Sequence, residues 1–233
     1  IHILKYMKKF ILSIAIFFLF LVQSFGHVQH YKDYNYLEYE LFRNNKSIGY
    51  HKYEFNRDRD NLSIKSEVSF KIIKLGVELY KYFAKSEENY VKGVFKSYYS
   101  KTKQNKKDRY VNIDVDPNDK VLIIDGSSYK GKANHDFIVG TWWNHEIIKA
   151  KAQISGISGR IIEQTVTFLG KEEVKIGDKT YKTLHFNFKS SDETLPDSKK
   201  LNTDIWYEEE TYLWVKAAFE KTGYWEYRIK KVN

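Results

Sequence analysis

The stretch Leu62-Ser63-Ile64-Lys65-Ser66-Glu67-Val68-Ser69-Phe70-Lys71-Ile72 decides the fold class of this chain. Leu62, Ile64, Ser66, Val68, Phe70 and Ile72 alternate with serine, lysine and glutamate. Because successive side chains of a strand point to opposite faces, this spacing puts one face in a core and the other in water. The pattern therefore predicts a strand of an antiparallel sheet.

The same period of two recurs along the chain, with turn signals between the segments. We expect further strands at Tyr36–Phe42, Ile48–Phe55, Val77–Tyr90, Val94–Lys103, Arg109–Val115, Val121–Ile124, Ile161–Leu169, Glu173–Ile176, Tyr181–Lys189, Asp204–Tyr207, Tyr212–Phe219 and Tyr224–Val232. Asn44-Asn45-Lys46 and Gly177-Asp178-Lys179 are typical hairpin turns, since asparagine and glycine tolerate positive φ. Some dozen strands with little helix predict an all-β protein.

The middle of the chain interrupts this alternation. Phe137–Ala152 contains Trp142-Trp143 and is expected to be a short helix or a loop that crosses the sheet, and Ser190–Asn202 is a polar loop around Pro196. The predicted architecture is a curved antiparallel sheet forming a half-barrel or β-clam. No linker or strict repeat divides it, so residues 27–233 are expected to form a single β domain.

The N-terminal segment has the features of a secretory signal peptide. Met7 is the only methionine, so we take it as the start, with residues 1–6 upstream of it. Two lysines precede the apolar run Phe10–Val22, and small residues follow, which predicts cleavage after Ser24 or Gly26. An uncleaved N-terminal anchor is the alternative, although the run is short for a membrane span. We expect a periplasmic or secreted protein.

Composition excludes several classes of protein. The chain has no cysteine, so it has no disulfide framework, no thiolate metal site and no cysteine nucleophile. Residues 1–26 hold three lysines and no acid, which leaves a net charge of +6 from His27 onward. Lysine and glutamate are interspersed rather than clustered, so nucleic acid is not an expected partner. No second apolar run follows the first, so the mature domain is not expected to span a membrane.

Three stretches together carry a resemblance to a known family. They are Ser47-Ile48-Gly49-Tyr50-His51-Lys52-Tyr53, the segment from Val68 through Tyr90, and Asp204-Ile205-Trp206-Tyr207 with the final hairpin. The chain from Tyr34 to Val232 resembles an uncharacterised domain-of-unknown-function family of exported proteobacterial β proteins. That family is distantly similar to the half-barrel fold of the periplasmic lipoprotein carriers. Tyr90 and Glu208 stand where the family pattern has tryptophan and aspartate. The resemblance implies a fold and a compartment, and no catalytic residues.

Aromatic residues make up 17% of the chain and suggest an apolar ligand site. Paired aromatics on a curved sheet build apolar surface with polar tips, as in small-molecule sites. The candidate ligand-binding residues are Tyr80, Tyr82, Trp142, Trp143, Trp225 and His51. The alternative is that the aromatic residues fill the core and that His51 is a hydrogen-bonded structural residue.

Motifs for catalysis or for metal binding are weak. The nucleophile elbow Gly-x-Ser-x-Gly is absent, because Gly156-Ile157-Ser158-Gly159 is followed by Arg160. Asp114, Asp116, Asn118 and Asp125 match part of a calcium loop, but Asp119 replaces its required glycine. His27 and His30 could hold copper only if cleavage follows Gly26. No catalytic residue, metal or cofactor is expected.

The sequence therefore predicts an exported, non-catalytic protein that binds an apolar or lipid-like ligand in the concave face of a half-barrel. The alternative is an envelope scaffold or adaptor that acts through contacts with a protein partner. A periplasmic enzyme is the third hypothesis, and it would gather His51, His145 or His185 with a carboxylate in a polar cleft.

Overall fold

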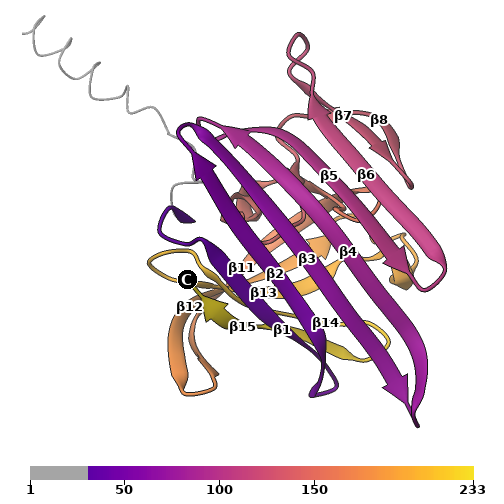
Figure 1. The fold of residues 1–233 in the computed structure, drawn as a ribbon, viewed down its shortest axis with the longest axis vertical. Helices are drawn as coiled ribbons and strands as arrows, with labels where there is room; N and C mark the ends of the chain where they lie inside the picture. The colour runs from indigo at the N-terminus through magenta and orange to yellow at the C-terminus, as the bar shows by residue number, and fades with distance from the viewer. Residues whose placement is uncertain (1–30) are drawn as a thin grey trace, which may run out of the picture.

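The computed structural model describes residues 31–233, which form one curved sheet of 15 strands (Figure 1). The strand order is β8-β7-β6-β5-β4-β3-β2-β1-β15-β14-β13-β12-β11-β10-β9. The chain thus forms two meanders, and they join where β1 pairs with β15. All strand pairs are antiparallel except the short pair β9–β10.

The strands are β1 (Tyr36–Arg43), β2 (Lys46–Asp58), β3 (Asn61–Lys74), β4 (Val77–Val91), β5 (Val94–Gln104), β6 (Lys107–Val115), β7 (Val121–Gly126), β8 (Lys130–Asn134), β9 (Ile138–Val139), β10 (Ala152–Ile154), β11 (Ile161–Ile176), β12 (Lys179–Ser190), β13 (Asn202–Glu208), β14 (Trp214–Glu220) and β15 (Tyr224–Val232). Two short 3-10 helices are η2 (His145–Lys149) and η3 (Asp197–Lys199). The hairpin turn between β1 and β2 is made by Asn44 and Asn45, both at positive φ as their residue types favour.

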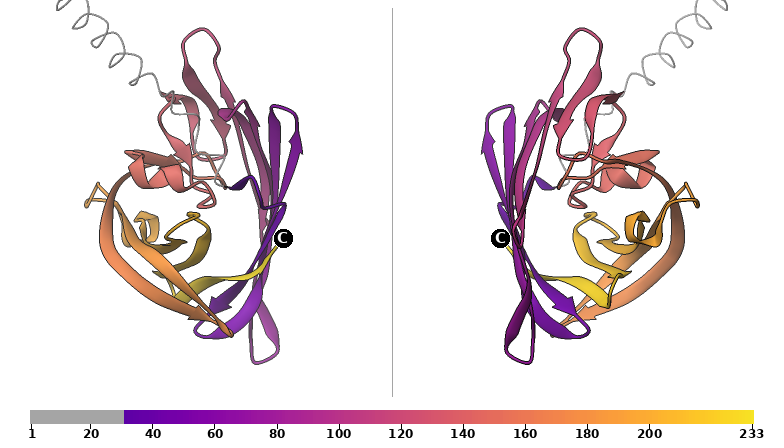
Figure 2. Two further views of the ribbon diagram at one scale, coloured as in Figure 1. Left: turned by 90° about the vertical axis from the view of Figure 1, so that its left-hand side faces the viewer. Right: turned by 90° about the vertical axis from the view of Figure 1, so that its right-hand side faces the viewer.

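The sheet bends so that its two halves face each other (Figure 2). Strands β1–β8 form one wall and β11–β12 curve round to form the other, while the two sheet edges, β8 and β9, do not pair. Residues 135–160, between β8 and β11, lie across the opening and are called the crossing segment below. The predicted all-β half-barrel with a short helix or loop across it is confirmed.

The core lies on the concave side of this sheet. Every second residue of β1 points inward, and Leu37, Tyr39 and Leu41 have no exposed surface. They pack with Trp214 from β14 and with Trp143 from the crossing segment in the main core cluster. A second cluster beneath β5–β8 includes Val111, Ile113, Leu122, Ile124 and Ile154. The alternation seen first in β3 therefore separates a packed inner face from a solvated outer face over most of β1–β8. On β13–β15 the outward residues Trp206, Ala218 and Glu226 are buried as well.

The observed strands differ from the predicted ones in two places. Strand β11 is continuous from Ile161 to Ile176, whereas two strands were expected, because a bulge between Phe168 and Gly170 absorbs the break in alternation. The short strands β8, β9 and β10 were not predicted at all. The expected helix or loop at Phe137–Ala152 contains η2.

Among residues 31–233, none of the helices is both long and apolar enough to cross a bilayer. The predicted signal peptide, with its apolar run Phe10–Val22, lies outside the described residues, as do His27 and His30. Export from the cytosol therefore stays a prediction.

Candidate ligand-binding site

A cavity of about 210 Å³ lies between the concave face of β2–β5 and the crossing segment; it is called the central cavity below. Its lining residues are His51, Tyr53, Ser66, Val68, Tyr82, Ala84, Lys85, Ser86, Tyr98, Ser100, Thr102, Gly140, Thr141, Trp142, Gln153, Ser155, Gly156, Ile157, Ile162 and Tyr227. The lining combines aromatic rings with hydroxyl groups. A mostly apolar cavity with a few polar groups is the usual form of a small-molecule site.

Small residues in the middle of the wall create this space. Ser66, Ser86 and Ser100 are direct cross-strand neighbours on β3, β4 and β5, and all three point inward. Large side chains at these inward positions would fill the hollow, as they do elsewhere in the core. Ser100 Oγ and the Tyr98 hydroxyl also donate to the carbonyl oxygen of Gly156, at 2.6 and 3.0 Å. These two bonds fix the crossing segment against the wall.

Tyrosines from opposite walls bond to the part of the crossing segment that covers the cavity. The Tyr53 hydroxyl donates to the carbonyl oxygen of Thr141 at 2.6 Å, and the Tyr207 hydroxyl donates to that of Trp142 at 2.8 Å. Trp142 has a φ of 59°, which is uncommon for a non-glycine residue. The two tyrosine bonds therefore stabilise a backbone turn that places the Trp142 ring in the cavity.

Three polar atoms in the cavity lining have no hydrogen-bond partner among residues 31–233. They are His51 Nδ1, Thr102 Oγ1 and Trp142 Nε1. A buried polar atom without a partner costs about 1–3 kcal/mol, so native proteins rarely keep one. All three lie on the surface of the central cavity, where a molecule inside it could bond to them.

His51 is neutral at physiological pH in this environment. Burial lowers the pKa of its imidazole to about 3. Its Nε2 lies 2.9 Å from Ser66 Oγ, and its ring centroid lies 4.3 Å from that of Tyr53. Lys85 belongs to the lining, but its ammonium pairs with Glu67 at 3.2 Å on the outer face. The polar groups that face the hollow are thus uncharged.

The structure separates the six predicted site residues into two groups. His51, Tyr82 and Trp142 line the central cavity. Tyr80 and Trp225 do not; both contact Phe70, at centroid distances of 5.9 and 5.3 Å, nearer the β3–β4 turn. Trp143 is fully buried in the core. Sequence reasoning missed the three serines, although Ser66 occupies an inward position of the very stretch that revealed the fold.

Trp143 binds a buried carboxylate beside the cavity. Glu88 accepts from Trp143 Nε1 at 2.9 Å and from Thr141 Oγ1 at 3.4 Å, and it also accepts from the Tyr90 hydroxyl. Burial raises the pKa of Glu88 to about 7, although these donors lower it in part. Glu88 thus anchors the crossing segment, and its charge changes near neutral pH.

The remaining candidate histidines lie outside the cavity. His185 packs on the Trp206 ring at 4.2 Å and lies within 2.9 Å of Glu172 and 3.2 Å of Asp204. His145 Nε2 lies 3.4 Å from Glu146. Neither histidine lines the cavity, so the carboxylates near them do not make it an acid–base site. No group of three or more His, Asp or Glu suited to a metal occurs in residues 31–233.

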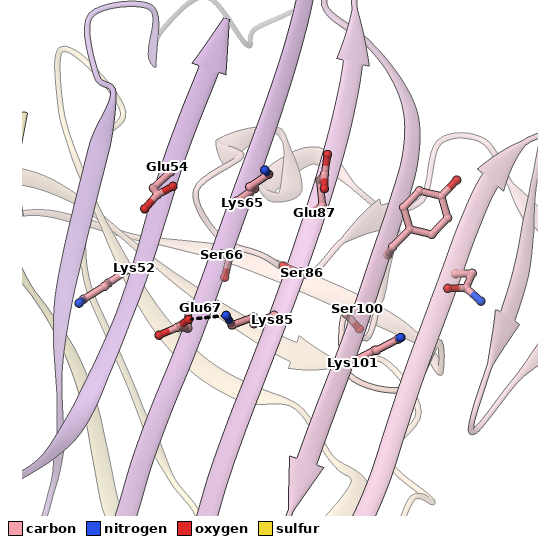
Figure 3. A pocket seen from close by; sticks show the side chains of 12 residues that line it. Lys52, Glu54, Lys65, Ser66, Glu67, Lys85, Ser86, Glu87, Ser100 and Lys101 are labelled. Carbon is pink, nitrogen blue, oxygen red and sulfur yellow. Dashed lines mark ion pairs between the residues drawn. The ribbon is translucent and has the colours of Figure 1, made fainter.

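The outer face of the same strands carries a shallow groove of about 550 Å³ (Figure 3). Lys52, Glu67, Lys85 and Lys101 are cross-strand neighbours there, as are Glu54, Lys65 and Glu87. Lysine and glutamate alternate in most of these positions, and the Glu67–Lys85 ion pair marked in Figure 3 is one result. This face presents a mixed-charge, solvated surface.

Comparison with known proteins places the chain in a family. The model of a family described as "Domain of unknown function (DUF6134)" matches residues 39–230. A crystal structure of a "Beta-barrel-like Protein of Domain of Unknown Function DUF1849" from Brucella abortus is similar in fold, with a TM-score of 0.57 and 9% identity. That similarity covers 85% of this chain and 96% of the other. None of the curated proteins matches the chain.

Proposed function

Because the chain belongs to the DUF6134 family, which carries no assigned activity, we propose from the site alone that it is a non-catalytic binding protein. Its ligand is a small, mostly apolar molecule, or the end of a longer apolar chain, that carries an uncharged hydrogen-bonding group. The ligand occupies the central cavity.

The unpartnered polar atoms around the cavity carry this proposal. Trp142 Nε1 can only donate, so it requires an acceptor on the ligand. His51 Nδ1 donates or accepts, depending on which direction its Nε2 bond to Ser66 takes. An alcohol, an amide or a carbonyl group satisfies such a set. A carboxylate fits less well, because no cation faces the hollow.

The volume limits the size of the ligand. A space of 210 Å³ corresponds to about seven water molecules at roughly 30 Å³ each. Pockets for drug-sized molecules begin at about 300 Å³. A whole long acyl chain therefore does not fit in the cavity. Its terminal carbons do.

The test uses a series of primary alcohols from butanol to dodecanol, titrated by calorimetry. Each added methylene buries about 0.8 kcal/mol of apolar transfer energy, so affinity should rise about fourfold per carbon until the cavity is full. Beyond that length the affinity should level off. If no alcohol in the series binds the folded protein, the proposal is wrong.

Two variants on adjacent residues of β4 localise the binding. Ser86→Leu fills the cavity, and Glu87→Leu adds the same side chain on the outer face, away from the cavity lining. We expect Ser86→Leu to abolish hexanol binding and Glu87→Leu to leave it unchanged. Trp142→Phe, which removes the donor, should weaken hexanol binding by about two- to tenfold. Equal affinities for Ser86→Leu and wild type would place the ligand elsewhere.

We also propose that this binding takes place outside the cytosol, in the periplasm or the medium. The support is the basic and apolar pattern that ends at Ser24 or Gly26. N-terminal sequencing of the protein from an exporting host tests it. A chain that keeps residues 7–26 and stays in the cytosol contradicts it.

A further inference from the structure

The turn between β3 and β4 exposes an unusual amount of apolar surface. Leu75 is 96% exposed, Ile73 61%, Val77 59% and Leu79 54%. The β3–β4 hairpin projects beyond its neighbours at the lower right of Figure 1. Contiguous exposed apolar residues on a water-soluble surface usually mark a place of interaction. Ile73 to Leu79 are called the apolar tip below.

The backbone of this turn would suit a different residue. Leu75 has a φ of 51° and Gly76 one of 77°, as in a two-residue type I′ turn. Asparagine, aspartate or glycine is the usual residue at the first of these positions, and leucine is disfavoured there. The other non-glycine residues with positive φ in the turns of this wall are all polar; they are Asn44, Asn45, Arg59, Lys92, Asn105 and Lys120. Leucine at this turn is thus not explained by the fold.

Positive charge surrounds the apolar tip. Residues 71–81 and the neighbouring turn at 103–108 contain six lysines and two acids. These lysines are Lys71, Lys74, Lys81, Lys103, Lys106 and Lys107. Lys71 pairs with Glu78 at 2.9 Å, and the other five form no ion pair within residues 31–233. The opposite end of the same wall differs, since its turns contain four aspartates (Asp58, Asp60, Asp116 and Asp119) against Arg59, Lys92 and Lys120.

We propose that the apolar tip docks the protein on the surface of a bilayer that contains anionic lipids. Exposed apolar side chains lie on both faces of the hairpin: Ile73 is opposite Glu78 in the register, whereas Val77 and Leu79 flank Glu78 and point to the other face. A bilayer surrounds such a projection, while a flat protein partner would cover one face only. Lysines at its base reach the lipid headgroups as the apolar residues enter the acyl boundary.

This docking would point the inner row of β3 and β4 toward the lipid. From the tip inward, cross-strand pairs Ile72–Tyr80, Phe70–Tyr82 and Val68–Ala84 lead to Ser66–Ser86 in the central cavity. The row is apolar up to the cavity, but Phe70 and Tyr82 are buried and stack at 4.8 Å, so an apolar ligand would pass along it only if these two rings moved apart. That consequence rests on the proposed function, whereas the docking itself does not and is tested without any ligand.

The absence of cysteine from the chain makes a site-specific test direct. Val77→Cys and Val94→Cys are a matched pair, because Val77 is 59% and Val94 58% exposed. Val77 begins β4 at the apolar tip, and Val94 begins β5 at the opposite end of the wall. Each variant is labelled with an environment-sensitive fluorophore and mixed with vesicles of phosphatidylcholine and phosphatidylglycerol at roughly three to one. The label at residue 77 should shift to shorter wavelength, and the label at residue 94 should not.

A second measurement separates docking from a structural role. Leu75→Asn suits the turn better, so the variant should fold at least as well as wild type. When Leu75→Asn is added to the labelled Val77→Cys protein, its partition onto the same vesicles should nevertheless fall at least tenfold. The labelled Val77→Cys protein without Leu75→Asn should show a similar loss on vesicles of pure phosphatidylcholine. Salt at roughly 1 M, where the Debye length is about 3 Å, should also weaken binding. Equal shifts at residues 77 and 94, no shift at either, or full binding by Leu75→Asn would overturn the proposal.

Discussion

The inner and outer faces of β3, β4 and β5 differ at directly adjacent residues. On the outer face Glu67, Lys85 and Lys101 stand side by side, and on the inner face Ser66, Ser86 and Ser100 do. The outer carboxylate of Glu67 has two partners, the Tyr50 hydroxyl at 2.7 Å and Lys85 at 3.2 Å. The inner face leaves polar atoms without partners around a hollow.

The two faces differ in what it costs to leave a polar group without a hydrogen-bond partner in the protein. An outer polar group without a protein partner bonds to water at no cost, whereas an inner one loses that option. The unpartnered groups around the cavity are therefore more informative about function than the many charged groups outside. Four experiments test this contrast, from the largest expected effect to the smallest.

Removing a large inner ring should have the greatest effect on stability. Trp143→Ala should lower the free energy of unfolding by about 3–5 kcal/mol, because it leaves a cavity and deprives Glu88 of a donor. Phe83→Ala on the outer face of β4 should cost below about 2 kcal/mol, since Phe83 is 37% exposed. Urea denaturation measures both. Similar losses would contradict the contrast between the faces.

The pH dependence of stability should report the inner carboxylate. The pKa of Glu88 is about 7 in the folded protein and near its ordinary value of 4.5 when unfolded. The contribution of Glu88 to the free energy of unfolding is therefore complete below pH 4.5. It is lost as the pH rises toward 7, by up to about 3 kcal/mol. Glu88→Gln cannot ionise, so its stability relative to wild type should increase across this range. A constant difference from pH 4.5 to 8 would show that Glu88 titrates normally.

The apolar tip is the exception among outward positions, and removing it should stabilise the protein. Leu75→Asn relieves a left-handed conformation that costs leucine about 1–2 kcal/mol, so the free energy of unfolding should rise by about 1 kcal/mol. Thermal denaturation provides the measurement. Asn105→Leu at the neighbouring turn should lower stability by at least as much, because Asn105 Oδ1 also accepts from Lys81 N at 2.7 Å. A loss on Leu75→Asn would mean that Leu75 makes contacts which stabilise the fold.

The outer ion pairs should matter least. A double-mutant cycle on Glu67 and Lys85 should give a coupling energy of about 0.2–1 kcal/mol, decreasing with added salt. Both side chains are partly exposed to water, which weakens their attraction. A coupling energy above about 2 kcal/mol would show that the outer face contributes more to the fold than its exposure suggests.

The sequence predicted those strands that have one face in the core and the other exposed to water. β3 was predicted almost to its ends because its alternation is nearly unbroken over Leu62–Ile72. β8 was missed because it offers a single buried apolar residue, Ala133. β11 was divided because the bulge at Gly170 has the same sequence pattern as a turn. Edge strands and bulges depend on their partners, which lie far away in the sequence.

The site could be predicted only in part, for a related reason. His51, Tyr82 and Trp142 were suggested because large amphipathic rings are conspicuous in a sequence. Alternation shows which face a residue occupies, but not how far along the strand it lies from a hollow, so Tyr80 and Trp225 were named as well. The serines that open the cavity look like polar interruptions in an apolar row until their strands are aligned.

The pairing of β1 with β15 has a consequence for how the molecule is made. These strands lie in the interior of the sheet, yet they come from the two ends of the described chain. All the other antiparallel pairs join strands that are consecutive in sequence, so each meander consists of local pairings that close short loops. The seam between the meanders needs the first and the last strand together, and its loop spans nearly the whole described chain. A chain truncated before β15 would lack this seam.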